Sequence, residues 1–310
     1  MLQTLWKGSA PLTATGLLML AALLVALAGL TLDPRIVTGA PAWLKPAKFA
    51  VSIAIYTFTL AWVFTRIPEW ARTRRTVGWM TAVAMIVEIV IIDLQAFRGT
   101  TSHFNVATAL DGVLFGIMGL AIVAQTLSSI AVAVALWRHR FEDAALGWAL
   151  RLGMIITIVG AMTGGLMTRP TRQQVDAARA GETMTVAGAH TVGAPDGGPG
   201  LAGTGWSTAH GDLRVPHFLG LHALQALPLI AFVLARRRLS DVVRVRFSLI
   251  AAVSYFGLFG ILVWQALRGQ SMLAPDTLTI MLFGVLVLGT AAAAATAVLR
   301  PRAARTPALA

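Results

Sequence analysis

The sequence of 310 residues has no cysteine and little charge, since only 12% of its residues are Asp, Glu, Lys or Arg. The absence of cysteine excludes disulfide bonds, thiolate metal sites and cysteine nucleophiles, which leaves histidine, carboxylates, methionine and hydroxyl groups for chemistry. The scarcity of charge excludes an ordinary soluble domain, in which about a quarter of the residues are charged. The short alternating segments that are typical of membrane β-barrels are also missing.

Apolar residues make up 57% of the chain and are gathered in long continuous runs. A membrane-spanning helix needs about 20 predominantly apolar residues. We therefore predict an all-α fold, a polytopic membrane protein with eight transmembrane helices in the lipid bilayer. The predicted spans cover residues 13–32, 47–66, 77–97, 106–137, 146–168, 217–236, 247–267 and 278–299.

The first run follows a single basic residue, Lys7, so a cleaved signal peptide is the alternative to a first span. The stretch from Leu17 to Leu32 is long for the apolar region of a signal peptide, and no clean cleavage site follows it directly. We expect this helix to be retained.

The formal net charge of +12 is distributed unevenly between the predicted loops. If the N-terminus is cytoplasmic, the loops on that side carry 16 of the 25 basic residues against four acids, and the other side carries nine of each. Basic residues gather on the cytoplasmic side of membrane proteins. The sequence thus predicts that both termini are cytoplasmic, and it gives no evidence for nucleic-acid binding.

Three short matches indicate an internal duplication. Their offsets of 170, 169 and 168 residues are nearly equal, and the matches occur in the same order along the chain. We predict two parallel four-helix units, residues 1–140 and 141–310, with a site at the interface between them. The matches are QAFRG (95–99) with QALRG (265–269), Phe49 with Phe218, and LFGI (114–117) with LFGV (282–285).

The second unit differs from the first by a long connection, 169–216, on the predicted extracytoplasmic side. The connection is rich in glycine, which is typical of a flexible linker, but it also contains Trp206, His210, Asp212 and Arg214. Loops of this length in compact proteins are often functional covers. The sequence is therefore compatible with either a flexible linker or an ordered lid.

Several polar side chains lie within the predicted spans. An ionisable group at the centre of a span costs about 2.5 to 3.5 kcal/mol and is a functional candidate by default. Glu88 lies near the middle of the third span, with Asp93 nearer its outer end. On the second span, Lys48, Ser52, Tyr56 and Thr59 form one stripe at helical spacing. We take Glu88, Asp93, Lys48 and Tyr56 as candidate catalytic or proton-handling residues; for Glu88 the alternative is a protonated group that stabilises helix packing.

Five of the six histidines lie on or near the predicted outer side, and His139 is the exception. His103 and His222 come from different spans and are the preferred ligands of a haem b or of a divalent Zn or Cu ion. His217 is the next choice, although it would lie about 140° from His222 on an ideal helix. Arg98 and Arg268 are candidates for the haem propionates, and Asp111 is a candidate to complete a metal site.

A row of glycines on the fourth span, at 112, 116 and 119, is consistent with a haem, but close helix packing is the cheaper explanation.

These residues predict an outward-facing His and carboxylate site that binds haem b or a metal ion for redox or metal-dependent chemistry. One alternative is a proton-coupled carrier of a small molecule or ion that uses Glu88 and Asp93 and takes its ligand from the outer side. Polar residues thin out in the cytoplasmic half of the spans, which speaks against a carrier. A membrane subunit without catalysis is the third possibility, and the oligomeric state is open.

Four strings resemble a group of bacterial multi-pass inner-membrane proteins without an assigned activity. This resemblance implies a bacterial inner-membrane protein and transfers no functional residue. The His and Asp pattern is also similar in part to the intramembrane ceramidase and adiponectin-receptor-like hydrolases. It departs from them, because Ser102 and His103 are adjacent here and the late His pair is spaced by five. The four strings are WLKPAKFA (43–50), FRGTTSHFN (97–105), GAHTVGAPDGGPG (188–200) and GDLRVPHFLGLHALQ (211–225).

Overall fold

Long helices account for most of the computed structural model, which describes residues 1–299. The helices are α1 (Leu2–Gly8), α2 (Ala10–Leu32), α3 (Leu44–Phe64), α4 (Ala71–Arg98), α5 (Ala109–Arg138), α6 (Ala144–Met162), α7 (Gly164–Met167), α8 (Arg172–Arg179), α9 (Arg214–Leu221), α10 (Ala223–Ala235), α11 (Asp241–Leu267) and α12 (Thr277–Leu299). Two short antiparallel ribbons pair β1 (Ile36–Val37) with β2 (Ala40–Pro41) and β3 (Thr191–Val192) with β4 (Gly211–Asp212).

Seven of these helices are long and apolar enough to cross a membrane, and α9 with α10 makes an eighth if this pair, bent by 48°, crosses as one span. The prediction of a mostly helical multi-pass membrane protein is confirmed. Only helices satisfy all their backbone hydrogen bonds within one segment, which is why long apolar runs adopt this form in lipid.

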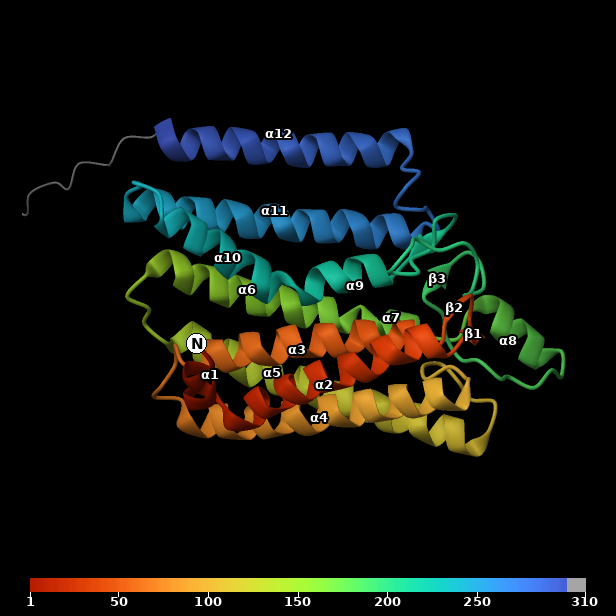
Figure 1. Cartoon of the computed structure of the whole chain (residues 1–310). Coiled ribbons are helices and arrows are strands. Elements are labelled where there is room, and N and C mark those ends of the chain that lie inside the picture. The colour runs from red at the N-terminus through yellow and green to blue at the C-terminus, as the bar shows by residue number, and fades with distance from the viewer. Residues whose placement is uncertain (300–310) are drawn as a thin grey trace, which may run out of the picture.

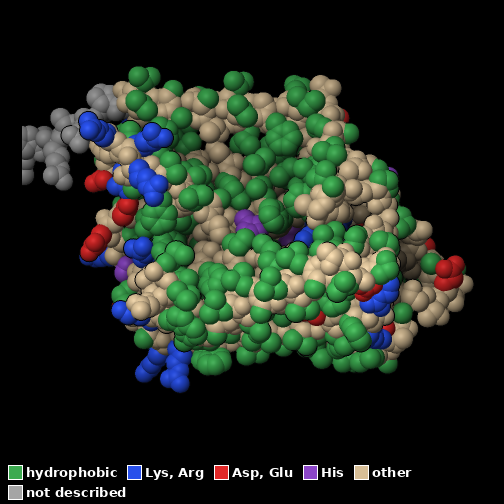
Figure 2. Space-filling model, viewed as in Figure 1, with side chains coloured by type: hydrophobic (Ala, Val, Ile, Leu, Met, Phe, Trp, Pro, Cys, Tyr) green, Lys and Arg blue, Asp and Glu red, His purple; other side chains and the backbone are tan. Residues whose placement is uncertain are grey.

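The long helices lie side by side, with α12 at one edge and α4 at the opposite edge (Figure 1). We call the two ends of this array the basic end and the loop end. The basic end holds the connections 65–70, 139–143 and 236–240, and lysine and arginine side chains gather there (Figure 2). The N-terminus and the end of α12 also lie at the basic end (Figure 1). The loop end holds the connections 33–43, 99–108, 168–213 and 268–276. Arg300, Arg302 and Arg305, which the charge count includes, lie outside the described residues.

Helix packing follows the same order in both halves of the chain. In the first half, α2 packs on α3 and α4, α3 packs on α4, and α4 packs on α5. In the second half, α6 packs on α9, α10 and α11, α10 packs on α11, and α11 packs on α12. The contact between α5 and α6 joins the halves. The two units at 1–140 and 141–310 and their duplication stay a prediction, with which this order agrees.

The turns after α4 and α11 have the same construction. Gly99 and Gly269 follow the two helices with φ of 73° and 72°, a left-handed conformation that glycine adopts without strain. Three residues before Arg98 and Arg268, the side-chain amides of Gln95 and Gln265 donate to the carbonyl oxygens of Thr101 (3.4 Å) and Ser271 (2.9 Å).

The helices that follow these turns are capped by the same two residue types in swapped positions, with Thr as the cap of α5 and Asp as the cap of α12. At α5, the side chain of Thr108 accepts from the backbone N–H of Asp111, and before α12 the side chain of Asp276 accepts from the backbone N–H of Thr279. Each acid also binds the arginine of its own turn, since Arg98 lies 2.6 Å from Asp111 and Arg268 lies 2.6 Å from Asp276. These caps satisfy backbone N–H groups that a helix start leaves without partners.

The core near the basic end is apolar and buried. It joins both halves of the chain, and its largest fully buried members are Leu12, Leu60, Phe64, Ile67, Leu136, Leu150, Met154, Leu224 and Leu227. This core closes the space between the halves toward the basic end.

Candidate functional site

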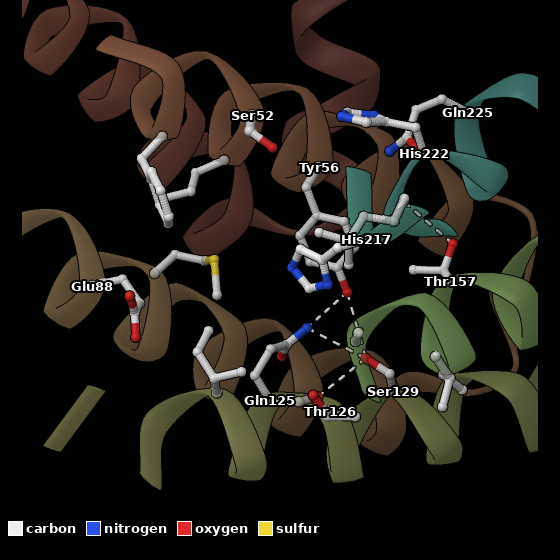
Figure 3. A pocket seen from close by; sticks show the side chains of 17 residues that line it. Ser52, Tyr56, Glu88, Gln125, Thr126, Ser129, Thr157, His217, His222 and Gln225 are labelled. Carbon is white, nitrogen blue, oxygen red and sulfur yellow. Dashed lines mark hydrogen bonds between the residues drawn. The ribbon is translucent and has the colours of Figure 1, made fainter. Parts of the chain in front are cut away.

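A cavity of about 160 Å³ lies between the two halves of the chain. Helices α3, α4 and α5 line it from the first half, and α6, α9 and α10 line it from the second half. Its polar lining residues are Ser52, Tyr56, Glu88, Gln125, Thr126, Ser129, Thr157, His217, His222 and Gln225 (Figure 3).

Gln125 organises a hydrogen-bond network at the cavity wall. Its side-chain amide donates to the hydroxyl of Tyr56 (2.7 Å) and to that of Ser129 (3.3 Å) (Figure 3). Its side-chain carbonyl oxygen accepts from the hydroxyl of Thr81 (2.7 Å). Thr81 lies about two turns before Glu88 on α4, toward the basic end. Polar residues that look scattered in the sequence therefore converge in one network, which continues from the cavity toward the basic end.

His217 is held by a close approach of α9 to α6. A Cβ atom on Gly160 would lie 2.5 Å from Cα of Gly220, so the two backbones meet only because both residues are glycine. The His217 Nδ1 atom lies 2.8 Å from the carbonyl oxygen of Gly160. A carbonyl oxygen only accepts, so Nδ1 carries the proton and Nε2 keeps a lone pair. His217 lines the cavity as a base or hydrogen-bond acceptor (Figure 3).

The break between α9 and α10 at His222 brings the two histidines of this span to one cavity. Thr157 of α6 bridges the break, since its hydroxyl accepts from the backbone N–H of Leu224 (3.2 Å) and donates to the carbonyl oxygen of Leu221 (3.4 Å). The bridge supplies partners to backbone groups that the break would leave free. The angle of about 140° between His217 and His222, which is expected on an unbroken helix, therefore does not apply to this span.

Two polar side chains of the cavity have buried atoms without a hydrogen-bond partner among the described residues. Glu88 is 2% exposed, and its Oε1 atom has no hydrogen-bond partner among the described residues. Both amide atoms of Gln225 likewise have no partner there. A buried polar group without a partner costs about 1 to 3 kcal/mol, more if it is charged. The lining thus offers unsatisfied groups from both halves of the chain.

The connection 169–216 is folded over the loop end and held by specific contacts. Lys48 donates to the carbonyl oxygen of Thr204 (2.5 Å), and Arg214 donates to that of Gly205 (2.7 Å) while it pairs with Asp212 (2.5 Å). Of the two interpretations left open by the sequence, the ordered cover agrees with these contacts.

A His–Asp pair that the sequence reading missed lies inside this connection. The Nδ1 atom of His190 is 2.6 Å from the carboxylate of Asp196, which also accepts the backbone N–H groups of His190 and Thr191. Burial would raise the pKa of Asp196, but the hydrogen bond from His190 and these N–H donors outweigh it and lower that pKa. The signal in the sequence is only a spacing of six residues within a glycine-rich loop.

His103 lies beside this pair rather than in the cavity. Its ring packs near those of Phe49, Phe104 and Phe115, with centroid distances of 5.6, 6.1 and 6.4 Å. Burial lowers the pKa of His103 well below its usual value, and the charges of Lys45, His190 and His217 lower it further. His103 is therefore neutral in the folded protein at pH 7.

We expect the stability of the loop end to fall as the pH drops below about 6.5, the ordinary pKa of histidine. His103 binds a proton more readily in the unfolded state, so stability rises with pH through this range and is constant above it. Thermal unfolding in detergent at pH 5 and pH 7.5 measures the effect. His103→Leu should weaken the pH dependence, whereas the exposed His210→Gln should leave it unchanged; an equal dependence in both variants would contradict the assignment.

The remaining predicted site residues are engaged outside the cavity. Asp93 is half-buried and does not line the cavity. Asp111 and Arg98 belong to the α5 cap, and Arg268 pairs with Asp276 and stacks 4.3 Å from the ring centroid of Trp264. Of the predicted candidates, the cavity brings together Tyr56, Glu88, His217 and His222.

Among the described residues, the cavity does not bring together a complete set of ligands for the predicted cofactors. Within residues 1–299, no three His, Cys, Asp or Glu side chains form a group that could hold a metal ion. A bis-histidine haem needs two axial ligands on facing elements, but His103 does not line the cavity, and His217 and His222 come from the same bent span. The haem and metal hypotheses stay predictions.

The glycine row of α5 has a different environment from the one predicted. Nothing lies within 4 Å of a Cβ atom placed on Gly112, Gly116 or Gly119. Within the described residues these glycines make no close helix contact, so the prediction of close helix packing stays a prediction.

Comparison of the chain with family models, with curated proteins and with solved structures found no match.

Proposed function

We propose that the chain is a proton-coupled carrier whose ligand binds in the cavity between its two halves. The observation that supports this proposal is the buried carboxyl of Glu88, which lines the cavity with a free oxygen. An ionisable side chain at such a position in a membrane protein is a functional candidate by default. Gln225 adds free hydrogen-bonding atoms from the other half.

The site's position suits a carrier. Substrate sites of many carriers lie near the middle of the membrane at the interface of two repeats, and transport is a rocking of one half against the other. Here the ligand would hydrogen-bond to Glu88, Gln225 and the Nε2 atom of His217 at such an interface. The network of Tyr56, Gln125 and Thr81 extends the polar path that the sequence left incomplete.

The same proposal includes the orientation and the location. We infer that the loop end faces the outside and the basic end the cytoplasm of a bacterial inner membrane, because basic residues gather on the cytoplasmic side. Glu88 then takes up a proton from the outer side with the ligand and releases it inward. His217 lines the same cavity, and we propose that its Nε2 atom binds the ligand.

We expect Glu88→Gln to abolish ligand uptake driven by a pH gradient while ligand exchange without a gradient persists. The neutral amide keeps the size of the carboxyl and one acceptor oxygen, but it cannot take up and release a proton. Ligands are identified by thermal-shift screening of the purified protein, and uptake is measured in proteoliposomes with an imposed pH gradient.

Asp93→Asn is the matched control, because Asp93 lies on the same helix but does not line the cavity. It should leave gradient-driven uptake intact. Gradient-driven uptake that survives Glu88→Gln would overturn the proposal.

A further inference from the structure

The cavity opens sideways, between α3 and the α9–α10 pair. Helix α3 packs mainly on α2 and α4, whereas α9 and α10 pack mainly on α6 and α11. Near the basic end the two groups meet through the rings of Trp62 and Phe232, whose centroids are 5.5 Å apart. Figure 2 shows a hollow on this face of the molecule, with histidine side chains visible inside it. The lining residues Ser52 and Tyr56 on α3 and Leu221, His222 and Gln225 on α9–α10 are all half-buried rather than enclosed.

Both water-facing routes are closed in the described structure. Toward the basic end, Leu60, Phe64, Leu224 and Leu227 are at most 2% exposed and fill the space between the halves. Toward the loop end, the connection 169–213 is tied down by Lys48 and Arg214. The remaining opening lies between membrane-spanning helices and faces the hydrocarbon of the bilayer.

The lining residues restrict which polar group of a ligand the cavity can bind. Phe49, Ile53, Ile122 and Leu221 make most of the wall apolar, while Glu88 and Gln225 provide the free polar atoms. No lysine or arginine is among the lining residues, although Lys45 lies over the ring of the lining residue Phe49, 5.8 Å from its centroid. The lining itself therefore lacks the side chains that usually bind phosphate. Glu88 and the Nε2 atom of His217 are acceptors, which suit a ligand that donates hydrogen bonds.

The volume limits what the cavity can hold. A cavity of about 150 Å³ accommodates a benzene molecule, so about 160 Å³ is enough for a small headgroup but not for an acyl chain. A chain attached to that headgroup would lie in the opening between α3 and α10.

We propose that the ligand is a single-chain amphiphile that enters from the bilayer and places a phosphate-free hydroxyl or amino headgroup against Glu88, Gln225 and His217. The inference rests on the proposed carrier function and names its substrate class. It extends that function by excluding a purely water-soluble ligand.

Photolabelling of the purified full chain in phosphatidylcholine liposomes tests the inference. The probe is a long-chain amino alcohol with a photoreactive diazirine close to its headgroup. We expect it to label peptides of α3 and α9–α10, and we expect an excess of the unlabelled amino alcohol to remove the labelling. Photoreactive phosphatidylcholine should not label these peptides.

Ser52→Trp narrows the opening from the α3 side and should abolish the labelling. Val51→Trp is the control, because Val51 is 41% exposed on α3 and does not line the cavity. Leu221→Trp narrows the opening from the opposite rim and carries the test if Ser52→Trp does not yield monodisperse protein.

Labelling that persists in both rim variants, or equal labelling by phosphatidylcholine, would overturn the inference. Gradient-driven uptake of a water-soluble ligand that Ser52→Trp leaves intact would overturn lateral entry and keep the carrier function. Labelling that Ser52→Trp blocks, together with uptake that does not depend on Glu88, would keep the amphiphile site and overturn proton coupling.

Discussion

Asp111→Ala is expected to lower the free energy of unfolding by roughly 3 kcal/mol, because it removes the shared acceptor of a buried network. The carboxylate, with a side chain 5% exposed, accepts from Arg98 (2.6 Å), Gln95 (2.8 Å) and Thr108 (2.6 Å). Truncation leaves the Gln95 amide and part of the Arg98 guanidinium buried without that partner. Unfolding in detergent, followed by tryptophan fluorescence, measures the loss.

The second half of the chain provides the matched control for this variant. Asp276 occupies the cap before α12 and pairs with Arg268, but its side chain is 40% exposed. Asp276→Ala should therefore lower the free energy of unfolding clearly less than Asp111→Ala does, as expected for an exposed cap. An equal decrease in the free energy of unfolding in the two variants would show that burial of the network does not determine the size of the decrease.

Most of the helical fold could be predicted because long apolar runs have few alternatives in lipid. The predicted spans 247–267 and 278–299 end at the same residues as α11 and α12. The predicted helix starts were less accurate than the ends. Helices α4 and α11 each begin six residues before the predicted span, because their first turns carry charged residues that a count of apolar residues leaves out.

The break at His222 could not be foreseen from its own segment. The predicted span 217–236 reads as one apolar run, and its interruption is stabilised by Thr157 from another helix. Such long-range partners leave no periodic pattern in the sequence. The same reason hid the pairing of Lys48 with Thr204.

The candidate site was predicted in part for a related reason. Rarity of polar residues in spans singled out Glu88, Tyr56, His217 and His222, and all four line the cavity. Position in the sequence does not show which polar residues take part in a helix cap, as Asp111 does. The direction in which a side chain points depends on how the helices pack.

Gly160→Val is expected to destabilise the protein by about 3 kcal/mol and to displace His217 from the cavity. Helices α6 and α9 touch through backbone: a Cβ on Gly160 would lie 2.5 Å from Cα of Gly220, and one on Gly220 would lie 2.5 Å from Cα of Gly160. Backbone atoms cannot rotate away as a flexible side chain can, so α9 must move. The hydrogen bond from His217 Nδ1 to the Gly160 carbonyl is then lost.

Gly116→Val on α5 is the control, because nothing lies within 4 Å of its added Cβ. It should unfold at nearly the same temperature as the original chain and retain photolabelling of the cavity, whereas Gly160→Val should lose both. A Gly160→Val protein of unchanged stability would mean that α6 and α9 can separate freely. In that case the tautomer of His217, which depends on the Gly160 carbonyl, would not be fixed, and His217 could not be assigned as the acceptor at Nε2.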